Sequence, residues 1–200
     1  MVQGDALAQV PAIAAAWTMP DRGSADQAAM AVLGDVLAGG DASRLYQGLV
    51  KGRELALNLD SLYGLTDAWT YDGPTLFTVF ALYKPDTSAD AVLAAIDEEI
   101  AKVAAEGVGD EELARVKTRM LADWYNGLEF FMSRADQLAK LQTLWGDASV
   151  ANKIPGWIEA VTSEDLQRVA RAYLTRDNRT VIDRVPDAML AARNSQEPAR

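Results

Sequence analysis

Histidine and cysteine, the residue types that most often perform hydrolysis or hold zinc, are both missing from this sequence. None of the 200 residues is a His or a Cys. His is the commonest general base near neutral pH, and Cys supplies thiolate nucleophiles, metal ligands and disulfides. Catalytic triads of the Ser-His-Asp and Cys-His kinds are therefore excluded, and so are zinc sites built on either residue.

The acidic clusters do not replace them. Residues 97–99 (DEE) are consecutive, so on a helix their carboxylates splay apart and cannot converge on a metal ion. They indicate a solvated helix face. Residues 110–112 (DEE) lack the spacing of a calcium-binding loop. Three acids there are typical of a helix N-terminus, where the helix dipole favours negative charge.

Composition and charge limit the remaining classes of function. Half of the residues are apolar, and the formal net charge is −10. A chain of this size can build one sizeable hydrophobic core. A negative chain without a Lys/Arg cluster is not expected to bind a nucleic-acid backbone. No apolar run reaches the roughly 20 residues that span a bilayer, and the first residues lack the basic region of a signal peptide.

The spacing of the apolar residues predicts four strands and several helices. Strands are expected at 9–19, 55–65, 76–83 and 179–185. Helices are expected at 25–37, 43–50, 89–106, from 110 to about 145 with a kink near Gly127, at 155–161, and after a Thr162 cap. Because these elements do not strictly alternate, they favour an α+β fold. We expect a mixed, mostly antiparallel sheet with helices packed on one face.

Three finer expectations follow. Leu55, Leu57 and Leu59 alternate with smaller or polar residues and should share one face of their strand. The strand at 76–83 (LFTVFALY) is apolar on both faces and should be central and covered. Residues 1–186 should form a single domain, and 187–200 a polar, unpatterned tail or linker.

The stretch from Leu33 to Leu59 carries the most information. It is predicted to contain the end of a helix, a Gly39-Gly40 break, a short second helix and the start of a strand. The glycine pair could form a loop that touches a substrate. The structural alternative is that it only lets one helix stop and the next begin.

This stretch resembles a signature of the insulinase/pitrilysin-type zinc peptidases, the inverted zincins. Their non-catalytic domains open with a strand and a helix that ends in GG-x-x-SRL-(Y/F)-Q-x-L. The matching residues here are Gly39, Gly40, Ser43, Arg44, Leu45, Tyr46, Gln47 and Leu49. Two later segments, GVGDEELARVKTRMLAD and AVTSEDLQRVARAYLTRDNRTVIDRVP, are similar in kind. The three segments extend over nearly the whole chain and resemble a bacterial processing-peptidase domain.

The resemblance implies that catalysis takes place elsewhere. The family holds zinc with an H-x-x-E-H helix whose Glu acts as the base, and a chain without His cannot contain that motif. The resemblance therefore implies no cofactor in this chain. It implies zinc in a catalytic domain that lies upstream in the same chain or in another subunit.

The family's active site also takes an Arg and a Tyr, seven residues apart, from the facing non-catalytic domain. They hold the substrate and stabilise the developing oxyanion. Those positions fall here on Val50 and Leu57, which can neither donate a hydrogen bond nor carry charge. Arg53 and Tyr46 are nearby but do not match the motif. This departure argues against a direct part in transition-state stabilisation.

The resemblance also makes five signature residues candidates for positions near the substrate: Gly39, Gly40, Ser43, Arg44 and Tyr46. For two of them a structural alternative stands beside this reading. Arg44 would pair with a local acid, and Tyr46 would pack under the sheet.

We therefore expect a non-catalytic domain of a zinc-dependent metalloendopeptidase that forms one wall of the substrate chamber and binds peptides. One alternative is a proteolytically inactive scaffold or interaction subunit of the same fold. Another is an unrelated α+β module that binds peptides along an exposed strand edge. An intact upstream H-x-x-E-H would favour the enzyme over the scaffold. Bacterial relatives favour an exported, periplasmic location over the cytoplasm.

Overall fold

One five-stranded sheet organises the computed structural model, which describes residues 1–63 and 67–196. The strand order is β1-β5-β2-β4-β3. The strands are β1 (Val2–Asp5), β2 (Ala12–Thr18), β3 (Ala56–Tyr63), β4 (Leu76–Tyr83) and β5 (Arg179–Pro186). β1 pairs parallel with β5, and the other pairings are antiparallel. The mixed, mostly antiparallel sheet expected from the sequence is confirmed.

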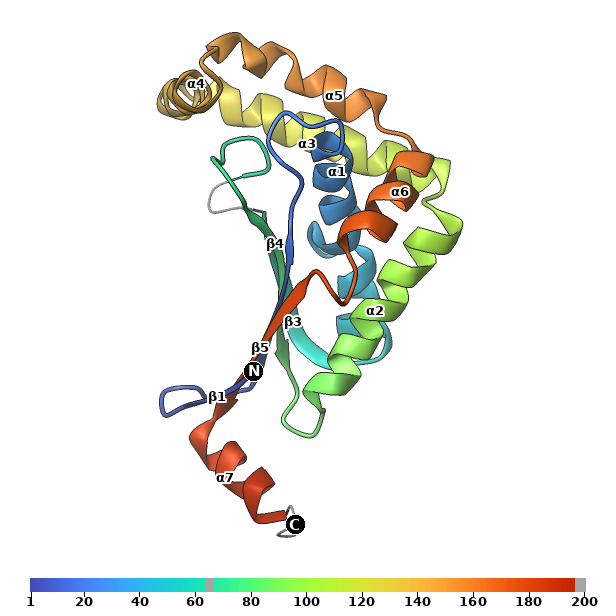
Figure 1. Cartoon of the computed structure of the whole chain (residues 1–200), viewed down its shortest axis with the longest axis vertical. Helices are drawn as coiled ribbons and strands as arrows, with labels where there is room; N and C mark the ends of the chain where they lie inside the picture. The colour runs from blue at the N-terminus through green and yellow to red at the C-terminus, as the bar shows by residue number, and fades with distance from the viewer. Residues whose placement is uncertain (64–66, 197–200) are drawn as a thin grey trace.

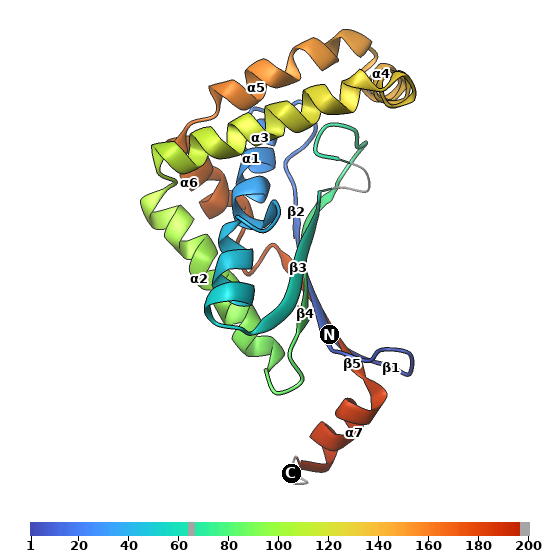
Figure 2. The same ribbon diagram turned by 180° about the vertical axis from the view of Figure 1, so that it is seen from behind.

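The helices cover one face of this sheet (Figures 1 and 2). They are α1 (Gln27–Ala38), α2 (Ala89–Glu106), α3 (Asp110–Glu129), α4 (Phe131–Trp145), α5 (Ile154–Ala160), α6 (Ser163–Tyr173) and α7 (Asp187–Gln196). A π-helix, η1 (Tyr46–Gly52), and a 3₁₀ helix, η2 (Ala148–Asn152), complete the described elements. α3, α4 and α5 lie beyond one end of the sheet, and α7 projects from the other end (Figure 1). Within residues 1–63 and 67–196, no helix is long and apolar enough to cross a bilayer.

The core lies between the sheet and the helices. On β4, Phe77, Val79, Ala81 and Tyr83 point toward the helices and are at most 1% exposed. Trp17 of β2 stacks on Phe77 with ring centroids 6.1 Å apart. Burial of these apolar side chains is the main force that holds the helices on this face.

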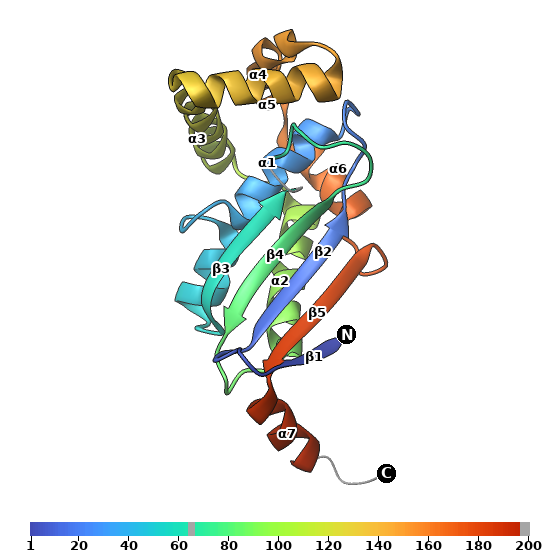
Figure 3. The same ribbon diagram turned by 90° about the vertical axis from the view of Figure 1, so that its left-hand side faces the viewer.

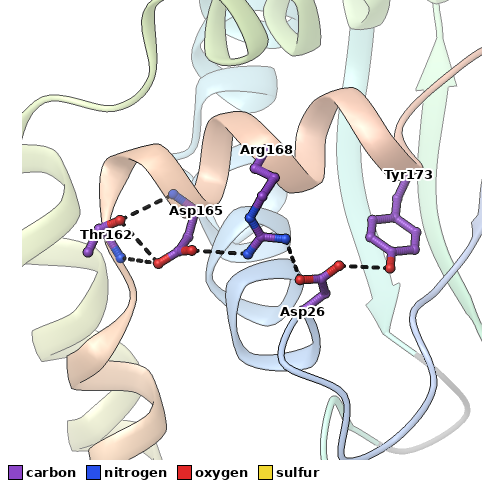
Figure 4. A network of polar contacts seen from close by, with 5 residues as sticks. All are labelled: Asp26, Thr162, Asp165, Arg168 and Tyr173. Atoms are coloured by element: carbon purple, nitrogen blue, oxygen red, sulfur yellow. Dashed lines mark hydrogen bonds and ion pairs between the residues drawn. The ribbon is translucent and has the colours of Figure 1, made fainter.

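A network of polar contacts fixes α6 against the start of α1 (Figure 4). Thr162 and Asp165 form a reciprocal capping box, in which the Asp165 backbone N–H donates to Thr162 Oγ1 over 3.2 Å. Arg168 donates to Asp165 over 3.0 Å and also to Asp26. The Tyr173 hydroxyl donates to the second oxygen of Asp26 over 2.9 Å. The predicted Thr162 cap is therefore confirmed, and Asp26 connects two helices that are far apart in sequence.

Several predicted elements differ from the structure. The second helix of the 33–59 stretch is the π-helix at 46–52, where the Arg53 N–H donates to the Gly48 carbonyl over 3.0 Å. β1 was not predicted at all. Residues 187–196 are helical rather than unpatterned. This helix contacts little besides β1 and β5, so its role as a linker stays a prediction.

The strand at 76–83 is central, as predicted, but the prediction that both of its faces are covered is wrong. Leu76, Phe80 and Leu82 are 40–47% exposed on the face that none of the described helices covers. The sequence pattern shows that both faces are apolar. It does not show whether this chain or another one covers them.

Candidate functional site

The open face of the sheet is a surface on which this chain could hold an extended partner (Figure 3). Strand register places Ile182, Ala14, Phe80 and Asp60 side by side in one row across β5, β2, β4 and β3. A second row contains Arg184, Ala12, Leu82 and Asn58. β2 contributes only small side chains here, between larger ones on both sides. The face therefore combines apolar contact with an acid and an amide toward β3.

β3 forms one edge of the sheet, so one side of its backbone has no strand partner in the described part of the chain. A β-bulge between Ala56 and Asn58 shifts the register there. Because of the bulge, Ala56 and Leu59 are buried and Leu57 is 49% exposed. The expectation that Leu55, Leu57 and Leu59 share one buried face is therefore wrong.

The two positions of the missing Arg/Tyr pair differ in surroundings. Val50, on η1, is half-buried and packs against the core. Leu57 stands exposed on the edge strand. Aliphatic side chains offer no hydrogen-bond donor at either position, so the structure provides no replacement for the pair at these two sites.

The signature residues lie in the helical layer, from the end of α1 to η1, and Arg44 connects them to the first turn of α3. Arg44 donates to both carboxylate oxygens of Glu112, from Nε over 3.0 Å and from Nη2 over 2.7 Å. Glu112 belongs to the acidic first turn of α3. The bidentate bond to Glu112 raises the pKa of Arg44 further above its usual value. This geometry agrees with the structural alternative for Arg44.

The glycine pair ends α1 and passes close to α3. Gly39 caps the helix, and a side chain at this position would collide with Asp35 and Arg119. Arg119 donates to the Gly39 carbonyl and pairs with Asp35 over 2.7 Å. Gly40 has φ of +77°, the left-handed region that glycine adopts without strain. Both glycines therefore have a structural reason for their identity.

Ser43 and Tyr46 complete the signature. Ser43 is 4% exposed, and its hydroxyl has no hydrogen-bond partner among the described residues. Tyr46 packs against the core, with Lys51 Nζ 5.8 Å from its ring centroid. Ser43 and Gly39 border a small pocket of about 150 Å³ between α1 and α3. A role of these residues near a substrate stays a prediction.

The residues of this chain do not fit zinc. His and Cys are absent from the sequence, and the described residues contain no group of three or more Asp or Glu side chains that could hold a metal ion. The acids at 97–99 pair separately instead. Asp97 binds Arg176 over 2.9 Å and also Arg179, Glu98 binds Arg53, and Glu99 binds Lys102 over 2.6 Å. They are more than the solvated face that the sequence indicated, because Asp97 connects α2 to the start of β5.

The chain belongs to the family described as the peptidase M16 inactive domain, whose model matches residues 2–120. This confirms the resemblance to zinc peptidases. An uncharacterized zinc protease of Streptomyces coelicolor is 32% identical over 148 residues, which are 74% of this chain and 31% of that protein. A second one, from Mycobacterium bovis, is 31% identical over 157 residues, or 78% of this chain and 34% of that protein. The chain thus spans about a third of the length of these curated relatives.

Solved structures show the same fold. A protease from Helicobacter pylori matches with a TM-score of 0.82 at 22% identity, covering 93% of this chain and 43% of that one. An inactive peptidase domain from Bordetella parapertussis matches with a TM-score of 0.77 at 24% identity. That match covers 88% of this chain and 93% of the other, so a domain of this size was solved by itself.

Sequence reasoning located the family signature but missed the open face as a candidate site. The signal was present in β4, where Leu76, Phe80 and Leu82 alternate with the core residues. When a strand is apolar on both faces and the helices of its own chain cover a single face, the other apolar face is left for a partner.

Proposed function

We propose that this chain is the non-catalytic domain of a zinc-dependent metalloendopeptidase and that its open sheet face forms one wall of the substrate chamber. The open face carries this proposal. It is apolar along β4, no helix within residues 1–63 and 67–196 covers it, and one of its edges is the side of β3 that pairs with no described strand. An extended peptide can contact such a face through its side chains and a strand edge through its backbone.

The catalytic groups come from a partner domain that carries H-x-x-E-H. The absence of His from this chain and its membership of the inactive-domain family support this division of roles. So does its span of about a third of the length of relatives described as zinc proteases. With aliphatic residues at Val50 and Leu57, this chain contributes to substrate binding and leaves oxyanion stabilisation to other groups.

We assign the corner between α3 and α4 as the surface that contacts this partner domain. Phe130, Phe131 and Met132 are consecutive and 72–74% exposed. Three large apolar side chains in a row are unusual on a free surface and typical of protein contacts. This chain matches about a third of the relatives' length, and the rest of such a protein is a candidate to cover these three side chains.

The second function is a scaffold or interaction subunit of the same fold. It uses the same open face and the same corner, and it differs only in the partner, whose H-x-x-E-H would be degenerate. Hydrolysis of a peptide by the assembled pair separates the two functions, because a scaffold pair leaves the peptide intact.

Photo-crosslinking tests the chamber wall. Benzoylphenylalanine in place of Phe80, in this chain assembled with its H-x-x-E-H partner, is expected to crosslink to a bound peptide substrate. The same group in place of Ala101, exposed on the helix side, is the matched control and should give no peptide adduct. Adducts at the Ala101 position alone, or at neither position, contradict the proposal.

A further inference from the structure

A second candidate site lies on the opposite side of the sheet from the open face. A cleft of about 500 Å³ is bordered by α1, β3, β4, α3, α4, α5 and the segment 67–69. Its size is in the range of ligand pockets in proteins. Phe77, Met120, Leu128 and Ile158 contribute apolar walls. Because Phe77 belongs to the helix-covered face of β4, the cleft is separate from the proposed chamber wall.

Three polar groups of the cleft wall lack a hydrogen-bond partner among the described residues. They are the Tyr63 hydroxyl, Trp124 Nε1 and Gln137 Nε2, and all three atoms are buried. Burial raises the pKa of Tyr63 well above its usual value, so this phenol keeps its proton and remains a donor. Buried polar groups are almost always paired in folded proteins. Three orphaned donors around one cleft therefore point to an occupant that supplies acceptors.

Carboxylates surround the same cleft. Asp35 pairs with Arg119, Asp136 pairs with Lys140 over 2.6 Å, and Asp67 accepts from the Trp69 backbone N–H over 2.7 Å. Asp123 is exposed and has no ion pair within the described part of the chain. The pKa of Asp35 is raised, first by burial, and the charge of Asp123 adds to that rise. A cation beside Asp123 would relieve this repulsion.

We propose that this cleft binds a peptide segment in which a large apolar side chain stands next to a Lys or Arg. The apolar side chain packs between Met120 and Ile158. Main-chain carbonyl oxygens of the segment accept hydrogen bonds from the three donors, and the basic side chain pairs with Asp123. An anionic ligand would meet the carboxylates instead, and a purely apolar one would leave the donors unpaired. This inference does not rest on the proposed function.

The indole N–H of Trp124 gives a direct readout. The chain has 5 Trp residues, and the Trp124→Phe variant assigns its indole signal in a ¹⁵N NMR spectrum. The probe is the acetylated, amidated hexapeptide Gly-Gly-Leu-Lys-Gly-Gly. It is expected to shift the Trp124 indole signal saturably, while Leu-Glu and Ala-Lys versions of the peptide bind at least about fivefold more weakly.

Two variants test the residues. Tyr63→Phe and Asp123→Asn should each weaken binding of the Leu-Lys peptide by about fivefold or more. Their matched controls, Tyr125→Phe and Asp177→Asn, lie outside the cleft and should bind as the wild type does. Tyr63→Phe should melt at the same or a higher temperature, since it removes an unpaired buried hydroxyl, so lost binding cannot be ascribed to unfolding.

Three results would each overturn the inference. The first is a Trp124 indole signal that the Leu-Lys peptide leaves unmoved. The second is equal binding of all three peptides, and the third is equal binding of the Leu-Lys peptide by wild type and both cleft variants. A further arm identifies the source of the segment. If the H-x-x-E-H partner supplies it, assembly with that partner blocks the hexapeptide, and if a substrate supplies it, assembly leaves hexapeptide binding unchanged.

Discussion

Arg44 and Glu112 form a bidentate ion pair between the loop after α1 and the first turn of α3. Their side chains are 21% and 24% exposed, so water screens the pair only in part. Arg44 also donates to the Gly107 carbonyl at 3.5 Å, which lies just before α3. The arginine of the family signature thus connects the loop after α1 to the first turn of α3.

This pair should be measurable as stability. Arg44→Met should lower the free energy of unfolding by about 1–2 kcal/mol, because a bidentate charged hydrogen bond is lost and Glu112 is left half-buried. Urea denaturation of the isolated chain measures this. Arg53→Met is the matched control, since its pair with Glu98 is 41% and 53% exposed and screened by water, and it should cost less than Arg44→Met. A larger loss for Arg53→Met than for Arg44→Met would contradict the assignment.

Stability should fall at alkaline pH because of Tyr71. Burial raises the pKa of Tyr71 to about 12, and its hydroxyl donates to the Pro20 carbonyl over 3.0 Å. In the unfolded chain a tyrosine ionises near pH 10, at its ordinary pKa. The stabilisation is therefore complete below pH 10 and is lost as the pH rises toward 12.

The loss attributable to Tyr71 is at most about 1.4 kcal/mol per pH unit and is steepest near the middle of that window. In Tyr71→Phe the fall of the unfolding free energy between pH 10 and 12 should be shallower by up to this amount, as measured by urea titrations at fixed pH. Identical slopes for wild type and variant would show that Tyr71 ionises equally in both states.

The capping box at Thr162 should contribute to the stability of α6. Thr162→Val keeps the shape of the side chain but removes the oxygen that accepts from the Asp165 N–H, and it should cost about 1 kcal/mol. Thr180→Val, on the exposed face of β5, should change stability by no more than about 0.5 kcal/mol. Thermal melts of both variants make the comparison, and equal midpoints would contradict it.

The two faces of β4 should respond differently to the same substitution. Phe80→Ser removes a side chain that is 40% exposed and should cost less than about 1 kcal/mol. Phe77→Ser empties a core site that is 1% exposed and should cost about 3–5 kcal/mol or abolish folding. If Phe80→Ser is as damaging in the isolated chain as Phe77→Ser, the face is not available to a partner.

Elements with a strong local pattern were predictable from the sequence. The strand at 76–83 and the helix at 89–106 have the predicted bounds, because period-two and helical spacing are local properties. β1 was missed because it is four residues long and pairs with β5 at the far end of the chain. The bulge beside Leu57 was missed because an extra residue in one strand is defined by its partner strand.

The candidate sites were less predictable than the fold. Sequence similarity drew attention to Gly39 and Arg44, for which the structure gives packing and ion-pair reasons. Which face of β4 stays open depends on where every helix packs. The cleft with Tyr63, Trp124 and Gln137 joins residues from three elements that have no common spacing in the sequence.

Hydrolysis by defined mixtures tests the central claim most directly. The purified chain, incubated with zinc and a quenched fluorescent peptide, should neither retain zinc in elemental analysis nor cleave the peptide. Addition of the polypeptide that carries H-x-x-E-H should produce zinc-dependent cleavage, and Phe80→Asp in this chain should reduce it at least tenfold. Zinc-dependent cleavage by the chain alone would contradict the account, as would cleavage by the mixture that Phe80→Asp leaves unchanged.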